Sequence, residues 1–193
     1  MKIVLKFGGT SLASPKDIRN VAKTITSFSK GNQIVVVCSA VDGVTDDLIT
    51  ISRLIEQRRK NNIVANLNGV IIKHRKLANQ TIKNSVIKKQ LLEKLNTDVS
   101  ELQELVRGLT LLKEVSARSL DYLISFGERL SDDLVSYALQ DLKKKSTALN
   151  GKEVGIVTDS NFGESRPLMD TTRIRISKTL GSLLSKKVIP VVG

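Results

Sequence analysis

The chain has 193 residues, a hydrophobic fraction of 40% and a formal net charge of +12 at pH 7. This length suits one domain with a proper core, because domains usually run to about 100–200 residues. No apolar run reaches the roughly 18 residues of a membrane span, and no signal-peptide pattern opens the chain, so we expect a cytoplasmic protein. The single cysteine, Cys38, lies in an apolar run, which predicts a buried thiol and argues against a zinc site.

The positive charge is concentrated between residues 60 and 97, where the sequence has eight Lys or Arg residues and a single acid, Glu93. This segment has no aromatic residue to stack on a base and no recognised nucleic-acid motif. Its charges are interleaved with apolar residues, as on the surface of a helix. We therefore favour a solvated helical face over a binding patch, and we expect no nucleic-acid partner.

The chain opens with a strand, a glycine turn and a helix. The apolar run at residues 3–5 predicts a central strand buried on both faces of a parallel sheet. A helix follows from about 15 to 29. Glycines without Cβ atoms let successive N–H groups approach a phosphate near a helix N-terminus, although a tight connection beside a solvated lysine would use the same residues. The residues at this turn are Lys6, Phe7, Gly8 and Gly9.

A second strand is expected at residues 34–38, parallel to the first. Ser39 and Ala40 follow it, and the turn leads into another helix near Thr45. Ligands of open α/β sheets bind outside the carboxyl ends of the strands, where both turns lie. The hydroxyls of Ser39 and Thr45 suit a carboxylate or phosphate, while Thr45 serves equally well as the N-cap of the helix.

From 50 to about 145 the chain reads as a layer of aliphatic helices. Within this layer we expect Gly127 to end one helix and Glu128 to open the next, where an acid favours the helix dipole.

Two further strands are predicted at residues 154–157 and 188–192, around a helix from roughly 171 to 186. A polar loop between them holds Asp159 and Phe162. Asp159 is explained equally well as a turn residue, and Phe162 equally well as a core residue. Both roles therefore stand beside ligand binding as alternatives.

Several segments resemble the aspartate kinases, or aspartokinases, of the amino acid kinase superfamily. The matching stretches are Lys6-Phe7-Gly8-Gly9-Thr10-Ser11, Ser39-Ala40 with the Gly-Val-Thr-Asp that ends at Asp46, Phe126-Gly127-Glu128-Arg129-Leu130-Ser131, and the loop from Thr158 to Gly163. The resemblance covers the whole chain. It implies an α/β three-layer sandwich with a mainly parallel central sheet.

By the same resemblance, residues 1–193 would form the N-terminal, substrate-binding portion of an amino acid kinase domain, with its helical segment at about 50–145. The family's catalytic domain continues into an Arg-Gly-Gly-Ser-Asp motif and an adenine-binding half, and regulatory domains follow. None of these is expected within the chain. The sheet is therefore expected to lack its C-terminal half, and the isolated chain is expected to be inactive.

The activity implied is transfer of a phosphoryl group from Mg-ATP to the side-chain carboxylate of L-aspartate, giving 4-phospho-aspartate, the first step towards lysine, threonine and methionine. ATP and Mg²⁺ are the cofactors implied, and a homo-oligomer is expected. Lys6 would be catalytic and would bind nucleotide phosphates together with Phe7, Gly8 and Gly9. The aspartate would contact Thr10, Ser11, Ser39, Ala40, Thr45, Glu128, Asp159 and Phe162.

Two other readings remain open at this point. The chain could be a kinase of the same superfamily that acts on glutamate, carbamate or a nucleotide. It could also be a non-catalytic binding or assembly chain that keeps the strand layout without the nucleotide half.

Overall fold

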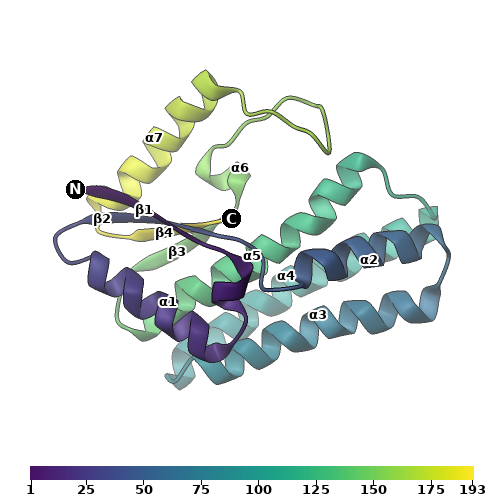
Figure 1. Cartoon of the computed structure of the whole chain (residues 1–193), viewed down its shortest axis with the longest axis horizontal. Helices are drawn as coiled ribbons and strands as arrows, with labels where there is room; N and C mark the ends of the chain where they lie inside the picture. The colour runs from purple at the N-terminus through teal and green to yellow at the C-terminus, as the bar shows by residue number, and fades with distance from the viewer.

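The computed structural model describes residues 1–193 and consists of a parallel sheet between two helical layers (Figure 1). The strands lie in the order β1-β2-β4-β3, and every neighbouring pair is parallel. Their bounds are β1 (Lys2–Phe7), β2 (Gln33–Cys38), β3 (Ser146–Leu149) and β4 (Ile189–Val192). The expected α/β class with a parallel central sheet is confirmed.

Most of the helices lie on one side of the sheet, where α1 and α5 pack beneath the strands and α2, α3 and α4 extend the layer sideways (Figure 1). On the other side α7 packs against β4. A cluster of 36 buried apolar residues joins the sheet to the larger layer, so these elements share one core. The helices are η1 (Gly9–Leu12), α1 (Pro15–Phe28), α2 (Val44–Glu56), α3 (Lys60–Thr81), α4 (Ser85–Leu112), α5 (Ala117–Asp141), α6 (Gly151–Val154) and α7 (Met169–Ser185).

The first strand differs from its prediction, because β1 is an edge strand and pairs only with β2. Its side chains alternate in exposure, and Val4 is 67% exposed. Ile3 and Leu5 instead pack against the core. A continuous apolar run therefore does not signal burial on both faces here, since helices cover only one face of this strand.

The strand predicted at residues 154–157 is also wrong. Residues Gly151–Val154 form the short helix α6, whose capping box joins the side chains of Asn150 and Glu153 to each other's backbone N–H groups. The third strand lies earlier, at Ser146–Leu149, and pairs with β4. Its sequence Ser-Thr-Ala-Leu has too little apolar periodicity to stand out after a long helix.

The helical stretch expected from 50 to about 145 is present as α2 to α5, but α5 does not break at Gly127. It runs unbroken from Ala117 to Asp141. Glu128 therefore lies in mid-helix, and its proposed alternative role as a first-turn partner of a helix dipole is wrong.

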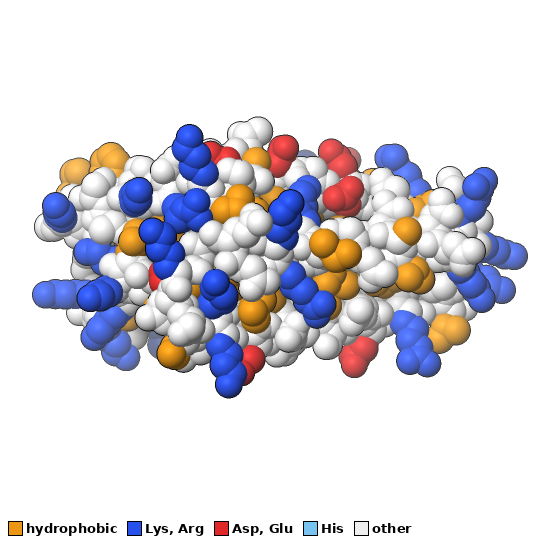
Figure 2. Space-filling view, turned by 90° about the horizontal axis from the view of Figure 1, so that it is seen from below, with side chains coloured by type: hydrophobic (Ala, Val, Ile, Leu, Met, Phe, Trp, Pro, Cys, Tyr) orange, Lys and Arg blue, Asp and Glu red, His pale blue; other side chains and the backbone are white.

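The basic residues between 60 and 97 lie on α3, on the first part of α4 and, for Lys83, on the turn between the two helices, and most are exposed. Figure 2 shows Lys and Arg side chains spread over the whole of one face of the molecule, with apolar side chains between them. Such a distribution is typical of a solvated helical surface. No helix in the structure is both long enough and apolar enough to cross a membrane.

Candidate functional site

The turns after β1 and β2 meet at the carboxyl ends of these two strands. Ser39 donates its backbone N–H to the carbonyl of Phe7 at 3.0 Å. Gly9 approaches Ala40 so closely that a Cβ on Gly9 would lie 2.9 Å from the Ala40 carbonyl oxygen. Only glycine fits at this contact. The sequence therefore brings the two predicted ligand-binding turns into one site.

Within the first turn, Lys6, Gly8 and Thr10 are exposed, while Phe7 and Ser11 are half-buried. Lys6 makes no ion pair with an acid of the chain. An exposed lysine that no acid pairs with, followed closely in the chain by two glycines, suits an anionic ligand.

Helix α5 is held against the turn after β2 by contacts from three of its residues. The backbone N–H of Ala40 donates to the Glu128 carboxylate at 3.4 Å. The Ser131 hydroxyl donates to the carbonyl of Ser39 at 2.7 Å. A Cβ on Gly127 would lie 2.8 Å from the Cβ of Ala40, so the mid-helix glycine permits this close approach. These contacts place Glu128 at the carboxyl ends of the strands.

Thr45 lies in the first turn of α2 and is half-buried, but it is not the N-cap. That position belongs to Gly43, whose φ of 77° is left-handed and favours glycine. The ammonium of Lys73 on α3 reaches the same turn and donates to the carbonyl of Asp42 at 2.6 Å. Sequence reasoning had grouped Lys73 with the solvated basic residues and missed this contact.

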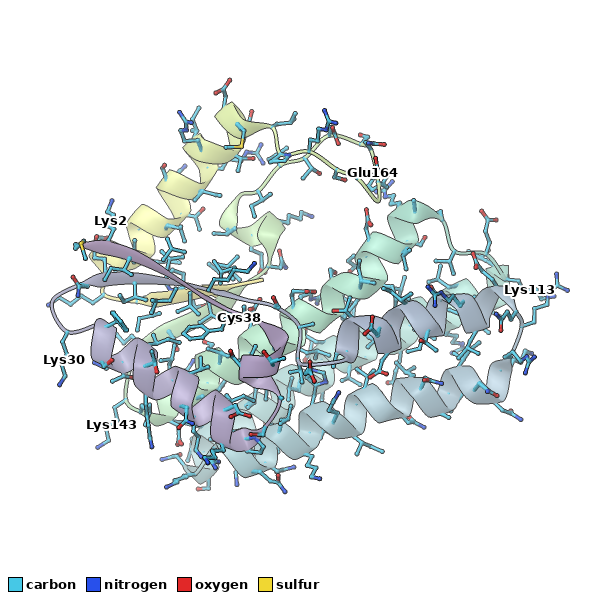
Figure 3. The ribbon with its side chains drawn as sticks, viewed as in Figure 1. Lys2, Lys30, Cys38, Lys113, Lys143 and Glu164 are labelled. Carbon is cyan, nitrogen blue, oxygen red and sulfur yellow. The ribbon has the colours of Figure 1, made fainter.

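Asp159 and Phe162 lie in a loop that packs over the amino-terminal end of α5 rather than on the turns described above. Asp159 braces this loop, since one carboxylate oxygen accepts the backbone N–H groups of Asn161 and Arg166, both at 3.1 Å. Phe162 is 41% exposed and so is not a core residue, and Arg118 lies over its ring at 5.5 Å. The loop tip near Glu164 is labelled in Figure 3.

Charged side chains on α4 and α5 form a network next to Glu128. The Arg129 guanidinium donates to Asp98 at 2.9 Å and to Glu101 at 2.6 Å, and it stacks over the ring of Phe126 at 4.3 Å. Lys94 pairs with Asp98 and, at 3.4 Å, with Asp133. The network fixes the orientation of α5 on either side of Glu128.

Asp132 was not among the predicted site residues, yet it is the most unusual acid in the molecule. It is 1% exposed, and neither of its carboxylate oxygens accepts a well-formed hydrogen bond. Burial, and after it the charges of Asp133 and Glu128, raise the pKa of this carboxyl to about 9. The signal in the sequence was an Asp-Asp pair among the apolar residues of a long helix.

Cys38 lies at the end of β2 close to this acid and is buried, as predicted (Figure 3). Burial raises the pKa of the Cys38 thiol well above its ordinary value, and the charge of Asp132 adds to the effect. The thiol therefore stays protonated near neutral pH.

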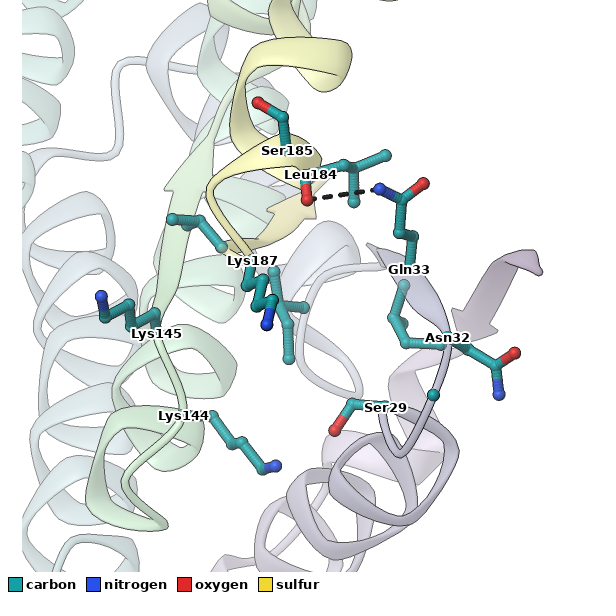
Figure 4. A pocket seen from close by; sticks show the side chains of 12 residues that line it. Ser29, Asn32, Gln33, Lys144, Lys145, Leu184, Ser185 and Lys187 are labelled. Atoms are coloured by element: carbon teal, nitrogen blue, oxygen red, sulfur yellow. Dashed lines mark hydrogen bonds between the residues drawn. The ribbon is translucent and has the colours of Figure 1, made fainter.

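A cavity of about 490 Å³ lies at the opposite, amino end of the strands. Figure 4 shows Lys144, Lys145 and Lys187 around it. It also adjoins the C-terminal ends of α1, α5 and α7, where helix dipoles favour basic residues. Since ligands of such sheets bind at the carboxyl ends, we place the candidate site at the turns and not in this cavity.

No group of three or more His, Cys, Asp or Glu side chains is placed to hold a metal ion. We assign Mg²⁺ no ligand in this chain.

Among curated proteins, the chain is similar to aspartokinase 2 (chloroplastic) of Arabidopsis thaliana, with 29% identity over 193 residues that cover 98% of this chain and 34% of the relative. It is also similar to the aspartokinase of Corynebacterium glutamicum, with 27% identity over 179 residues that cover 92% of this chain and 29% of the relative. The chain thus spans about a third of the length of these relatives.

Among solved structures, E. coli aspartokinase III in complex with aspartate and ADP superposes with a TM-score of 0.86 at 21% identity, covering 100% of this chain and 40% of that one. Aspartate kinase from Clostridium acetobutylicum gives a TM-score of 0.68 at 19% identity, covering 100% of this chain and 38% of that one. These likenesses establish a shared fold. The amino acid kinase family matches residues 1–193, and the chain therefore belongs to the amino acid kinase family.

Proposed function

We propose that this chain forms the aspartate-binding and phosphate-binding part of an ATP-dependent aspartate kinase. The observation that carries the proposal is the meeting of the Lys6-Gly8-Gly9 turn, the Ser39-Ala40 turn and Glu128 at the carboxyl ends of β1 and β2. The curated relatives named above are aspartokinases, which supports aspartate as the substrate. In this proposal residues 1–193 are the substrate-binding portion of the domain.

The reaction would depend on the positioning of the two substrates and on positive charge, more than on proton transfer. A carboxylate with an ordinary pKa of about 3.9 is already ionised at pH 7, so it can attack a phosphoryl group without a general base. Lys6 would offset the charge of the transferring phosphoryl group, and the Gly8 and Gly9 amides would donate to its oxygens. Magnesium, bound with the nucleotide, would neutralise phosphate charge.

The amino acid would be held from the other side of the site. Glu128 would receive its ammonium group, because this carboxylate is half-buried and has only one weak backbone donor. Thr10, Ser11, Ser39, Ala40 and Thr45 would surround the two carboxylates with hydroxyl and amide donors. Asp159 and Phe162 would act from the loop over α5.

The test is the binding of L-aspartate to wild-type chain and to Glu128→Gln, measured by isothermal titration calorimetry. Glutamine keeps the size and removes the charge, so the dissociation constant should rise by about tenfold or more. Glu114→Gln, on an exposed acid between α4 and α5, is the matched control and should leave the constant unchanged. Equal aspartate binding by wild type and Glu128→Gln would refute the proposal.

A further inference from the structure

Asp132 lies one helical turn after Glu128 on α5, and both acids flank the end of β4. A Cβ placed on Gly193 would lie 2.5 Å from the Cβ of Glu128 and 2.7 Å from a carboxylate oxygen of Asp132. The two side chains therefore adjoin the same backbone position. This position is at the carboxyl end of the sheet, where the candidate site lies.

Asp132 differs from the other buried acids nearby because no Lys or Arg side chain pairs with it. Asp98 is paired with Arg129 and Lys94, and Asp133 is paired with Lys94. A carboxyl group buried without a partner costs stability and is rare in folded proteins. Acids with such perturbed surroundings gather at functional sites, where a ligand completes the pairing.

A small cavity of about 100 Å³ opens beside Asp132. The two cations in its wall, Lys94 and Arg129, already have acidic partners, so Asp132 is the buried acid of the wall that no cation pairs with. Its volume is a few times the roughly 30 Å³ of one water molecule. The cavity thus admits a small cationic group such as a primary ammonium, but not a nucleotide.

We propose that Asp132 is a further specificity-determining residue of the amino acid site, which together with Glu128 receives the ammonium group of the substrate. This inference rests on the proposed function. Two carboxyl groups at adjacent turns then distinguish an amino acid from a dicarboxylate of the same length. Hydroxyl and amide donors at the strand ends cannot make that distinction.

Pairing with an ammonium would ionise Asp132. Its carboxyl has a pKa of about 9 in the free chain and is therefore protonated near pH 7.5. An ammonium group placed against it favours the carboxylate, so the bound proton leaves to the buffer as the ion pair forms. The charged and titratable groups that surround Asp132 are Glu128, Arg129 and Asp133 on α5, Cys38 on β2, Lys94 on α4 and Glu153 on α6. The backbone amide of Gly193 after β4 also faces it.

The experiment is calorimetric titration of the 193-residue chain with L-aspartate and with succinate at pH 7.5, in buffers of different ionisation enthalpy. Succinate has the same two carboxylates and lacks the ammonium. For the wild type we expect release of about one proton per aspartate and none per succinate. Asp132→Asn should abolish the release and weaken aspartate binding by about 10-fold to 100-fold. Glu153→Gln, which changes an exposed acid in the wall of the same cavity, should keep the release.

The outcomes separate this inference from the proposed function. Aspartate binding without proton release in the wild type, or with release that persists in Asp132→Asn, would overturn the role of Asp132 and leave the proposed function standing. Failure of the wild-type chain to bind aspartate would overturn the proposed function and the inference with it. Proton release that disappears only in Asp132→Asn supports both.

Discussion

Replacing Asp132 by Asn should stabilise the protein, and the gain should grow with pH. The pKa of this carboxyl is about 9 in the folded chain against an ordinary 3.8, so at pH 7 the folded state retains a proton that the unfolded state releases. Each pH unit by which the solution lies above 3.8 costs about 1.4 kcal/mol of folding stability. This cost amounts to about 2 kcal/mol at pH 5 and about 4 kcal/mol at pH 7. Asn has nearly the same shape and does not titrate, so the variant avoids this cost.

Urea denaturation followed by circular dichroism at pH 4, 5 and 7 measures the difference directly. At pH 4 the unfolded state holds the proton about half of the time, so the cost falls below about 1 kcal/mol and the wild type and Asp132→Asn should be about equally stable. Glu114→Gln, on an exposed residue between α4 and α5, serves as the control and should change stability little at any pH. A difference between Asp132→Asn and the wild type that stays constant with pH would show that Asp132 is not protonated in the folded chain.

Three further predictions concern other residues. Lys6→Ala should lower turnover by on the order of 10³-fold in the active enzyme that contains this chain, because it removes one preorganised charge; an unchanged rate of aspartyl phosphate formation in a hydroxamate assay would contradict the role of Lys6. Gly127→Ala should destabilise the fold by about 1–3 kcal/mol, because the new Cβ would collide with Ala40. The control Gly108→Ala, where a Cβ meets open space in a helix, should stabilise the fold by up to about 1 kcal/mol. Similar urea midpoints for the two variants would refute the packing argument. Burial lowers the pKa of His74 to about 4 from 6.5. The free energy of unfolding should therefore fall by about 3 kcal/mol as the pH drops from 6.5 to 4. In His74→Leu this free energy should fall less over the same pH range.

The parts of the fold that follow from local chemistry were predictable from the sequence. Helix α1 begins where expected, because the Ser14 hydroxyl accepts the backbone N–H of Asp17 and Pro15 occupies the first turn. Strands β1, β2 and β4 appear as apolar runs of strand length. Strand β3 could not be recognised, because its four half-buried residues owe their conformation to pairing with β4.

The candidate site was predictable where a turn motif marks it and not where tertiary packing does. The two turns after β1 and β2 are visible as glycine and hydroxyl residues after apolar runs. Gly127 misled the prediction, because its helix-breaking tendency of about 1 kcal/mol is outweighed by the close contact that it allows with Ala40. Asp132 escaped notice because only the three-dimensional structure shows that no cation reaches it.

The strand order β1-β2-β4-β3 has a consequence for how the chain folds. The last strand in the sequence fills the gap between β2 and β3, so two halves of the sheet remain unjoined until residues 189–192 are available. During synthesis, β1, α1 and β2 can form an early unit, and the helical layer must then hold β2 and β3 about two strand spacings apart, roughly 10 Å. Closure of the sheet thus depends on contacts between segments more than 150 residues apart, such as that between Gln33 and the carbonyl of Leu184, a separation of 151 residues. Contacts this remote in sequence make folding slow, because a long stretch of chain must be closed into a loop before β4 can pair with both of its neighbours.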